Sequence, residues 1–174
     1  MRRLLPCLVI LVLLVPACGD DDSDPSAQGS GQQSETTEEP SPSAQREALK
    51  DTTTKPVIPK PSGAPPRKLV KEDIVKGKGR AAKPGDTLTV HYVGVLFSTG
   101  DEFDASWDRG APFDVELGAG GVIEGWDKGL VGIRKGGRRI LTIPPELAYG
   151  PEGYPPTIGP NETLVFVIDA VDIN

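Results

Sequence analysis

Residue types that commonly do covalent chemistry are scarce in this chain and do not form a catalytic group. The sequence holds one histidine, His91, and two cysteines, Cys7 and Cys18, both near the N-terminus. The rest of the chain therefore lacks a cysteine nucleophile and a cysteine-ligated metal, and one histidine does not supply the ligands of a zinc site. The glycines at 118–121 lack the lysine and hydroxyl residue that follow in a phosphate-binding loop. We predict no metal and no cofactor.

The remaining candidates for chemistry are aromatic side chains, which all lie in the last hundred positions. They are Tyr92, Phe97, Phe103, Trp107, Phe113, Trp126, Tyr149, Tyr154 and Phe166. Aromatic residues at strand and helix spacing most often form a core. The alternative is that some of them enclose an apolar pocket. The shape of that pocket and its exclusion of water would then be responsible for the activity. His91 alternates with Tyr92, so we expect it on the opposite strand face, in a structural or surface role.

Strand patterns are expected to position these residues. Residues 87–96 alternate, with Leu88, Val90 and Tyr92 on one face and Thr89 and His91 on the other. Further alternating or apolar runs predict strands at 68–75, 113–117, 141–143 and 163–170.

One segment between the strands has a different period. Ile123, Trp126 and Leu130 recur at helical spacing, directly after the glycines at 118–121. Residues 146–162 are rich in proline and glycine and predict a loop. The expected fold is α+β, with a twisted antiparallel sheet of about five strands around one short α-helix.

The first 18 residues are typical of an export signal. Arg2 and Arg3 precede an apolar run at 4–15, which is too short to span a membrane. The end of this segment, Ala17-Cys18 after Pro16, resembles the lipobox of bacterial lipoproteins, in which the cysteine carries the lipid. This resemblance implies a protein anchored to the cell membrane on its extracytoplasmic side. An ordinary signal peptide with a chance cysteine and an uncleaved signal anchor are the alternatives.

The rest of the chain divides into a linker and a folded domain. Residues 19–66 contain nine acidic and four basic residues and no aromatic residue. Such a segment buries too little apolar surface to offset its ordering entropy, so we predict a disordered acidic linker rich in Ser and Pro. Residues 67–174, with 13 basic and 16 acidic residues, are long enough for one core.

The basic residues of the domain do not indicate a nucleic-acid partner. A small cluster, Arg134, Lys135, Arg138 and Arg139, surrounds two glycines. We interpret this cluster as a solvated turn, with an anion site as the alternative. No dense basic surface is predicted, so we expect no binding to nucleic acid.

Several motifs, taken in order, resemble the FK506-binding-protein family of peptidyl-prolyl isomerases. The most specific are Val122-Ile123-Glu124-Gly125-Trp126 and Ala148-Tyr149-Gly150. The others are VHYVG at 90–94, FDAS at 103–106, PFDVELG at 112–118 and TLVFVIDA at 163–170. The resemblance covers about residues 68–173. In the loop, Tyr154 and Thr157 occupy positions at which the family frequently has histidine and an aliphatic residue. This loop would border the substrate, so the preference for particular substrate sequences stays open.

The resemblance implies a set of pocket residues. Trp126 would form the floor, and Ile158 would cap the pocket from the loop. The walls would be Tyr92, Phe103, Phe113, Val122, Ile123 and Phe166. The polar groups would be the Asp104 carboxylate, the Tyr149 hydroxyl and the backbone N–H of Ile123. Asp104 would either act directly on the substrate or orient the wall.

The same resemblance implies rotation about Xaa–Pro bonds in exported proteins, without proton transfer or a covalent intermediate. The barrier is the loss of amide resonance on twisting, and a dry apolar pocket favours the twisted amide. Expected partners are proline-containing polypeptides and macrolides of the FK506 and rapamycin type, and the protein is expected to be a monomer. The alternatives are a non-catalytic module that binds proline segments or a partner, and a chaperone. The short 149–163 loop leaves no room for a chaperone insert.

Overall fold

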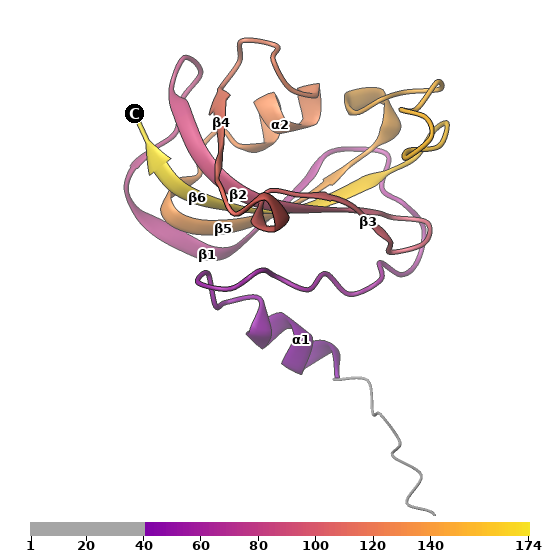
Figure 1. The fold of residues 1–174 in the computed structure, drawn as a ribbon, viewed down its shortest axis with the longest axis horizontal. Coiled ribbons are helices and arrows are strands. Elements are labelled where there is room, and N and C mark those ends of the chain that lie inside the picture. The colour runs from indigo at the N-terminus through magenta and orange to yellow at the C-terminus, as the bar shows by residue number, and fades with distance from the viewer. Residues whose placement is uncertain (1–40) are drawn as a thin grey trace, which may run out of the picture. The chain divides into compact units, whose positions relative to one another are not determined.

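The computed structural model of the protein describes residues 41–174 (Figure 1). The predicted signal segment 1–18, the lipidation site Cys18 and residues 19–40 of the predicted linker lie outside the described residues. In the described part no helix is long and apolar enough to cross a membrane.

The domain is built on one antiparallel sheet, in which the strands lie in the order β1-β5-β6-β2-β3 and β4 pairs with β2. The strands are β1 (Val70–Ala81), β2 (Thr87–Leu96), β3 (Glu102–Ala105), β4 (Phe113–Glu116), β5 (Arg134–Ile143) and β6 (Leu164–Ile173). The helices are α1 (Pro42–Ala48) and α2 (Glu124–Gly129), with 3-10 turns at Trp107–Arg109 and Pro145–Leu147. The α+β fold is confirmed, with six strands rather than about five. The additional strand is β3, which has only four residues.

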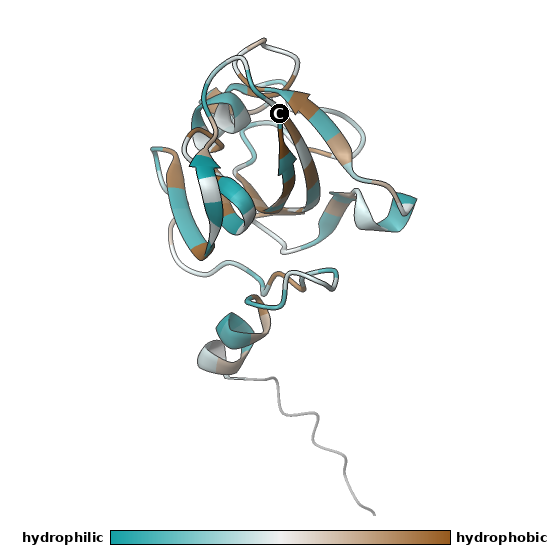
Figure 2. Ribbon diagram, turned by 90° about the vertical axis from the view of Figure 1, so that its left-hand side faces the viewer, coloured by the Kyte–Doolittle hydropathy of each residue, from teal (hydrophilic) through white to brown (hydrophobic). Residues whose placement is uncertain are grey.

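Helix α2 packs against the inner face of the sheet, where the main core lies (Figure 1). Leu88, Val90, Leu141, Leu164 and Ile168 are completely buried in this core. Figure 2 shows the corresponding apolar stretches in brown along the central strands. The predicted alternation in β2 and the predicted helix around Trp126 are both found.

Two glycines allow α2 to lie very close to β5. A Cβ atom at Gly125 would lie 2.3 Å from Cγ2 of Ile143, and one at Gly129 would lie 2.5 Å from Cδ1 of Leu141. Glycine is a poor helix former, so these positions are explained by packing rather than by propensity. The close approach fixes the height of α2, and therefore of Trp126, above the sheet.

The outer face of the sheet is also covered, by a segment that the sequence did not predict to be ordered. Residues 49–60, here called the N-terminal strap, follow α1 and run along the outer face (Figure 1). Ile58 packs with Phe97, Trp107 and Ile140 against a second buried cluster, Val93, Val95, Ala105 and Val165. This differs from the disordered linker predicted for 19–66: its part from 41 onward belongs to the same compact unit as the domain.

A buried arginine explains why the strap is ordered. The Arg138 side chain is completely buried, and it pairs with Asp169 at 2.5 and 2.7 Å. It also donates hydrogen bonds to the carbonyl oxygens of Leu49, Asp51 and Thr54 at 3.0, 2.7 and 3.2 Å. These bonds satisfy three backbone carbonyl groups of the strap and tie it to the sheet.

The basic cluster around 134–139 is therefore neither a solvated turn nor an anion site as a whole. Arg138 lies under the strap, and Arg139 is buried on the inner side, where it pairs with Asp73 and donates to the carbonyls of Gly129 and Val131. Only Arg134 and Lys135 are exposed. Successive residues of β5 point to opposite faces, which separates the two buried arginines.

Candidate active site

An aromatic cavity of about 230 Å³ opens between α2, the inner face of the sheet and the loop after β5. It is lined by Tyr92, Phe103, Asp104, Phe113, Gly121, Val122, Ile123, Trp126, Tyr149 and Phe166. Nine of the ten predicted pocket residues are among them. A larger hollow of about 390 Å³ lies beside the N-terminal strap, but Phe97 is the only aromatic residue in its lining.

The floor and walls of this cavity are a network of rings packed edge to face. Trp126 lies 5.1 Å from Tyr92 and 5.3 Å from Phe166, measured between ring centroids, at interplanar angles of 85° and 86°. Phe103 packs on Phe166 at 5.5 Å and 86°. Edge-to-face pairs of this kind stabilise one another beyond their buried area. The rings therefore form a rigid apolar surface.

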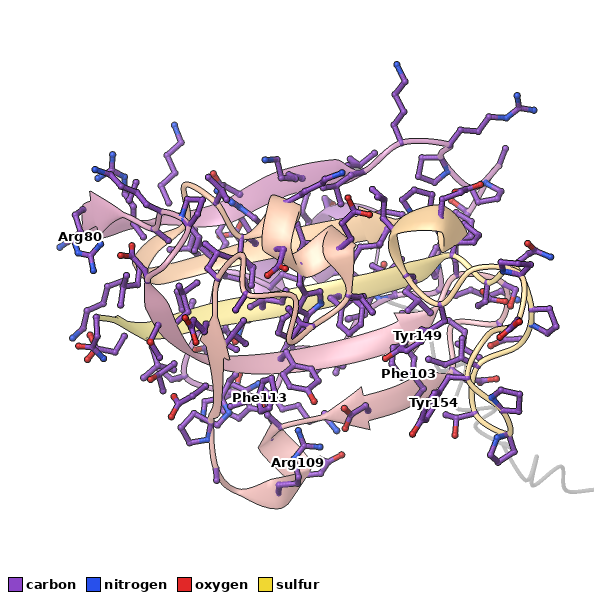
Figure 3. All side chains as sticks on the ribbon, turned by 90° about the horizontal axis from the view of Figure 1, so that it is seen from above. Arg80, Phe103, Arg109, Phe113, Tyr149 and Tyr154 are labelled. Atoms are coloured by element: carbon purple, nitrogen blue, oxygen red, sulfur yellow. The ribbon has the colours of Figure 1, made fainter. Side chains whose placement is uncertain are left out.

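Exposure divides the aromatic residues into floor and rim. Trp126, Phe166 and Tyr92 are 4, 5 and 7% exposed, whereas Phe113 and Tyr149 are 41 and 38% exposed. Figure 3 places Tyr149 close to Phe103 and Tyr154, with Phe113 further along the same side and Arg80 at the far end of the sheet. Large exposed aromatic groups around a buried aromatic floor are expected where a ligand completes the packing.

One side of the cavity is polar and tightly connected. Tyr92 donates its hydroxyl proton to Asp104 at 2.5 Å, and Arg109 donates to the other oxygen of Asp104 at 2.5 Å and to the Tyr92 hydroxyl at 2.7 Å. The Arg109 guanidinium also lies 5.5 Å from the centroid of the Tyr92 ring. Both carboxylate oxygens are thus engaged within the wall, which holds Asp104 and Tyr92 in one orientation.

Burial raises the pKa of both pocket hydroxyls, which are already protonated at neutral pH. It raises the pKa of Tyr92 above its usual value, and the hydrogen bond to Asp104 adds to this effect while Arg109 opposes it. Burial likewise raises the pKa of Tyr149, with smaller contributions from Tyr154 and Asp104. Hydrogen bonds to Tyr92 and Asp104 raise the pKa of the Arg109 guanidinium. At neutral pH the Tyr149 hydroxyl is therefore a hydrogen-bond donor.

Two donors at the cavity have no partner within residues 41–174, the Tyr149 hydroxyl and the backbone N–H of Ile123. The indole N–H of Trp126 also has no partner there, but it is buried. Ile123 precedes the first turn of α2, where backbone N–H groups lack intrahelical acceptors. Unpaired donors beside an apolar floor are suited to a ligand that presents carbonyl oxygens.

Ile158 was predicted to cap the cavity, and it is not among the residues that line it. It is 3% exposed and belongs to the main core. The Tyr154 N–H donates to the Ile158 carbonyl at 2.8 Å, and the Ile158 N–H donates back to the Tyr154 carbonyl at 2.9 Å. This tight loop, with an isolated bridge at its base, directs Ile158 inward and leaves Tyr154 62% exposed near Tyr149.

Sequence reasoning missed Arg109 and Gly121. Arg109 ends a 3-10 turn that is closed by Gly110 in the left-handed conformation, and it has no periodic neighbour that would mark it. The only indication in the sequence was that Arg109 is a basic residue five positions after Asp104. His91 lies away from the cavity as predicted, with Nδ1 3.0 Å from Oγ of Ser106 and its ring stacked on Trp107 at 4.4 Å.

No group of three or more His, Cys, Asp and Glu side chains within residues 41–174 is arranged to hold a metal ion. The cavity can bind by shape, by ring contacts and by a few hydrogen bonds to a carbonyl-bearing ligand. These are the features of a site for non-covalent recognition of an apolar group.

Comparison with known proteins identifies the family. The family model described as FKBP-type peptidyl-prolyl cis-trans isomerase matches residues 78–171. An FK506-binding protein of Streptomyces anulatus is 54% identical over 120 residues, which cover 68% of this chain and 97% of that protein.

Two further similarities agree. A probable FK506-binding protein of Corynebacterium glutamicum is 52% identical over 117 residues, 67% of this chain and 97% of that protein. The crystal structure of AtFKBP13 matches with a TM-score of 0.56 and 40% identity, over 61% of this chain and 93% of the other. Fold, site and sequence therefore agree that the chain belongs to the FKBP-type peptidyl-prolyl cis-trans isomerases.

Proposed function

We propose that the aromatic cavity catalyses rotation about Xaa–Pro bonds in exported proteins by binding the twisted prolyl amide non-covalently. The observation that carries this proposal is the edge-to-face floor of Trp126, Tyr92 and Phe166. Tyr149 and Ile123 line the same cavity with donors that have no partner in the described part of the chain. A proline ring is a compact apolar group that suits such a floor, and the carbonyl groups beside it would accept the two hydrogen bonds.

The physics of the prolyl amide explains why such a pocket can act without a nucleophile. Cis and trans Xaa–Pro forms differ by only about 0.5–1 kcal/mol, but they interconvert over tens to hundreds of seconds. The barrier of about 18–20 kcal/mol is the loss of amide resonance. Water stabilises the planar, more polar amide, so transfer into a dry aromatic pocket favours the twisted one. Binding energy from the proline ring and the neighbouring residue then contributes to the twist.

Asp104 is proposed to orient the wall rather than to act on the substrate. Both of its oxygens accept strong hydrogen bonds, from Tyr92 and Arg109. A carboxylate held in this way keeps the Tyr92 ring against Trp126. The Tyr149 hydroxyl, which is protonated and has no partner within residues 41–174, is the better donor to a substrate carbonyl.

The same cavity is proposed to bind macrolides of the FK506 and rapamycin type. The relatives from Streptomyces anulatus and Corynebacterium glutamicum are named as FK506-binding proteins. The residues that line this cavity include every predicted ligand position except Ile158. A macrolide that mimics a twisted prolyl amide should therefore compete with substrate.

Export and lipid attachment at Cys18 are proposed from the sequence, from the basic start, the apolar run at 4–15 and the small residue before Cys18. Substrates would then be polypeptides that fold outside the cytoplasm. The protein would act as a monomer at the membrane surface.

A protease-coupled isomerisation assay with the full-length chain tests the catalytic proposal. We expect accelerated cis-to-trans conversion of a proline tetrapeptide and inhibition by FK506. A folded chain that binds proline peptides without turnover would favour the binding module instead. A folded chain with neither turnover nor FK506 binding would contradict the assignment of the cavity.

A further inference from the structure

The N-terminal strap reaches the segment that forms the polar wall of the pocket. The ammonium nitrogen of Lys55 lies 2.7 Å from a carboxylate oxygen of Glu102, and 2.7 and 2.9 Å from the two oxygens of Asp108. Glu102 begins β3, and Asp108 lies in the 3-10 turn that follows β3. One cation of the strap therefore joins both ends of the segment 102–109, here called the wall segment.

The wall segment carries three groups of the site. Phe103 and Asp104 follow Glu102 directly, and Arg109 follows Asp108. Each carboxylate held by Lys55 is thus adjacent in sequence to a residue that forms the wall. A displacement of Glu102 or Asp108 would be passed on through one peptide unit to the Phe103 ring or to the Arg109–Asp104–Tyr92 network.

The sheet alone holds the wall segment weakly. Strand β3 is at the edge and pairs only with β2, through Ala105, Asp104 and Glu102, with an irregularity in the register. Only four residues are in the strand, and Asp108 is more than half exposed. Edge segments with few ladder bonds are the first to fluctuate in a folded domain. A contact from outside the strand can therefore change its position.

The strap, in contrast, is firmly held on both sides of Lys55. The carbonyl of Thr54, the preceding residue, accepts a hydrogen bond from the buried Arg138, and Pro56 is buried directly after Lys55. Ile58 packs into the outer cluster three residues later. The backbone at Lys55 is therefore held in place. Its side chain is 35% exposed, so water screens the ammonium group only partly.

We propose that Lys55 is a positioning residue for the isomerase pocket, which ties the wall segment to the N-terminal strap and so maintains the orientation of Phe103, Asp104 and Arg109. This inference rests on the proposed function of the cavity. The strap lies upstream of residues 78–171, which the family model matches, so the tie is a feature of this chain rather than of the part described by that model.

The test compares three variants of the full-length chain. Lys55→Ala removes the tie, Lys55→Arg keeps a cation that can bridge two carboxylates, and Lys50→Ala is the matched control. Lys50 also forms an exposed ion pair, at 2.6 Å, but with Glu47 of α1 rather than with a residue of the wall segment. The readouts are kcat/KM on a proline tetrapeptide, the Kd for FK506, and amide NMR shifts of residues 103, 104 and 109.

We expect Lys55→Ala to lower kcat/KM and FK506 affinity by about two- to fivefold, the range of a partly exposed ion-pair network. The amide NMR shifts of residues 103, 104 and 109 should change with this loss, whereas the urea midpoint should stay the same. Lys55→Arg should restore both quantities, and Lys50→Ala should match the wild type. The gap between wild type and Lys55→Ala should close at about 1 M salt, because the tie is partly exposed and therefore screened.

A second variant changes one of the two carboxylates that Lys55 contacts. Asp108→Asn keeps the side-chain shape but weakens the bond to Lys55, and it should lower kcat/KM in the same direction. Combined with Lys55→Ala, it should cause little further loss, because the two residues act through one interaction.

The outcomes separate this inference from the proposed function. Lys55→Ala with wild-type kcat/KM, FK506 affinity and wall amides would overturn the positioning role and leave the isomerase assignment intact. An equal loss in Lys50→Ala would also overturn it. A wild-type chain without isomerase activity or FK506 binding would instead overturn the function on which the inference rests.

Discussion

The Tyr149 hydroxyl is the pocket group whose role can be tested with least disturbance. It lies at the rim, 38% exposed and without a partner within residues 41–174, and its raised pKa keeps it protonated. Tyr149→Phe deletes this one donor and keeps the ring. A neutral hydrogen bond contributes about 0.5–1.5 kcal/mol, so FK506 affinity should fall about three- to tenfold. Isothermal titration calorimetry measures this loss.

The Tyr149→Phe variant should keep the melting temperature of the wild type, because the rim ring makes few core contacts. Its kcat/KM should fall less than its FK506 affinity, since dehydration by the aromatic floor would contribute most to the twist. Unchanged FK506 affinity would contradict the role of the hydroxyl as a donor.

Phe166 is a residue at which stability and binding cannot be separated by one variant. It is 5% exposed and packs edge to face on both Trp126 and Phe103. Phe166→Ala should lower the free energy of unfolding by about 3–5 kcal/mol, because it leaves a cavity beneath the floor. Urea denaturation measures this loss, and folding must be established before a lower turnover is interpreted.

Phe113 provides the matched control for Phe166. It belongs to the same cavity but is 41% exposed, so Phe113→Ala should weaken FK506 binding with a much smaller effect on stability. Equal destabilisation by both variants would mean that the rim is part of the core rather than a surface completed by ligand.

At the scale of elements, the position of α2 depends on the absence of side chains at two helix positions. Gly125→Ala would place a Cβ atom 2.3 Å from Ile143, so α2 would have to move away from β5. Alanine is the better helix former by about 1 kcal/mol, yet overpacking costs typically about 1–3 kcal/mol. We expect a net loss of stability in urea denaturation and a weakened FK506 site, since α2 carries Trp126.

Gly159→Ala is the control for this variant. A Cβ atom at Gly159 would meet no atom within 4 Å, and its φ is not in the left-handed region. This substitution should leave the urea midpoint unchanged. A Gly125→Ala variant as stable as Gly159→Ala would show that α2 can be displaced at little cost.

The elements also show what a sequence can and cannot predict. Residues 87–96 and the helix around Trp126 have strong periods, and both were predicted from the sequence. Strand β3 was missed because four residues are too few to show a clear period, and its order comes from pairing with β2. The burial of Ile158 in the core was not predicted, because it depends on loop hydrogen bonds rather than on residue type.

At the scale of the whole molecule, the least predictable feature was the strap. Its composition is that of a disordered linker, and the residue that orders it, Arg138, lies 84 to 89 positions away in the sequence. The local pattern of apolar and polar residues does not reveal a contact with such a distant residue. Most of the pocket, in contrast, was predicted because the resemblance on which it depends is carried by short contiguous motifs around Tyr92, Trp126 and Tyr149.

The lipid anchor is a second property of the whole chain that can be tested. Cys18→Ser should prevent lipid attachment and shift the full-length protein from the detergent phase to the aqueous phase in a phase-partitioning experiment. Cys7→Ser is the matched control, because Cys7 lies within the apolar run and should not affect partitioning. Equal partitioning of Cys18→Ser and wild type would contradict lipidation at Cys18.

Limited proteolysis tests whether the strap is part of the folded domain. Leu49 is 5% exposed, and the Arg138 bonds cover the backbone from 49 to 54, so the resistant core of the wild type should begin upstream of Leu49 rather than near Arg67. Arg138→Met should expose the strap to cleavage and destabilise the domain by about 3–5 kcal/mol, because Asp169 is left buried without its partner.

A double variant separates loss of the strap from loss of the buried ion pair. Arg138→Met with Asp169→Leu removes both charges, so most of the stability should return while the three strap carbonyls remain without a donor. Its resistant core should therefore begin near Arg67 even though the domain is folded. If the double variant still protects the strap, apolar contacts such as those of Ile58 hold it, and Arg138 serves only to neutralise Asp169. Arg134→Met, an exposed position on the same strand, should protect the strap as the wild type does.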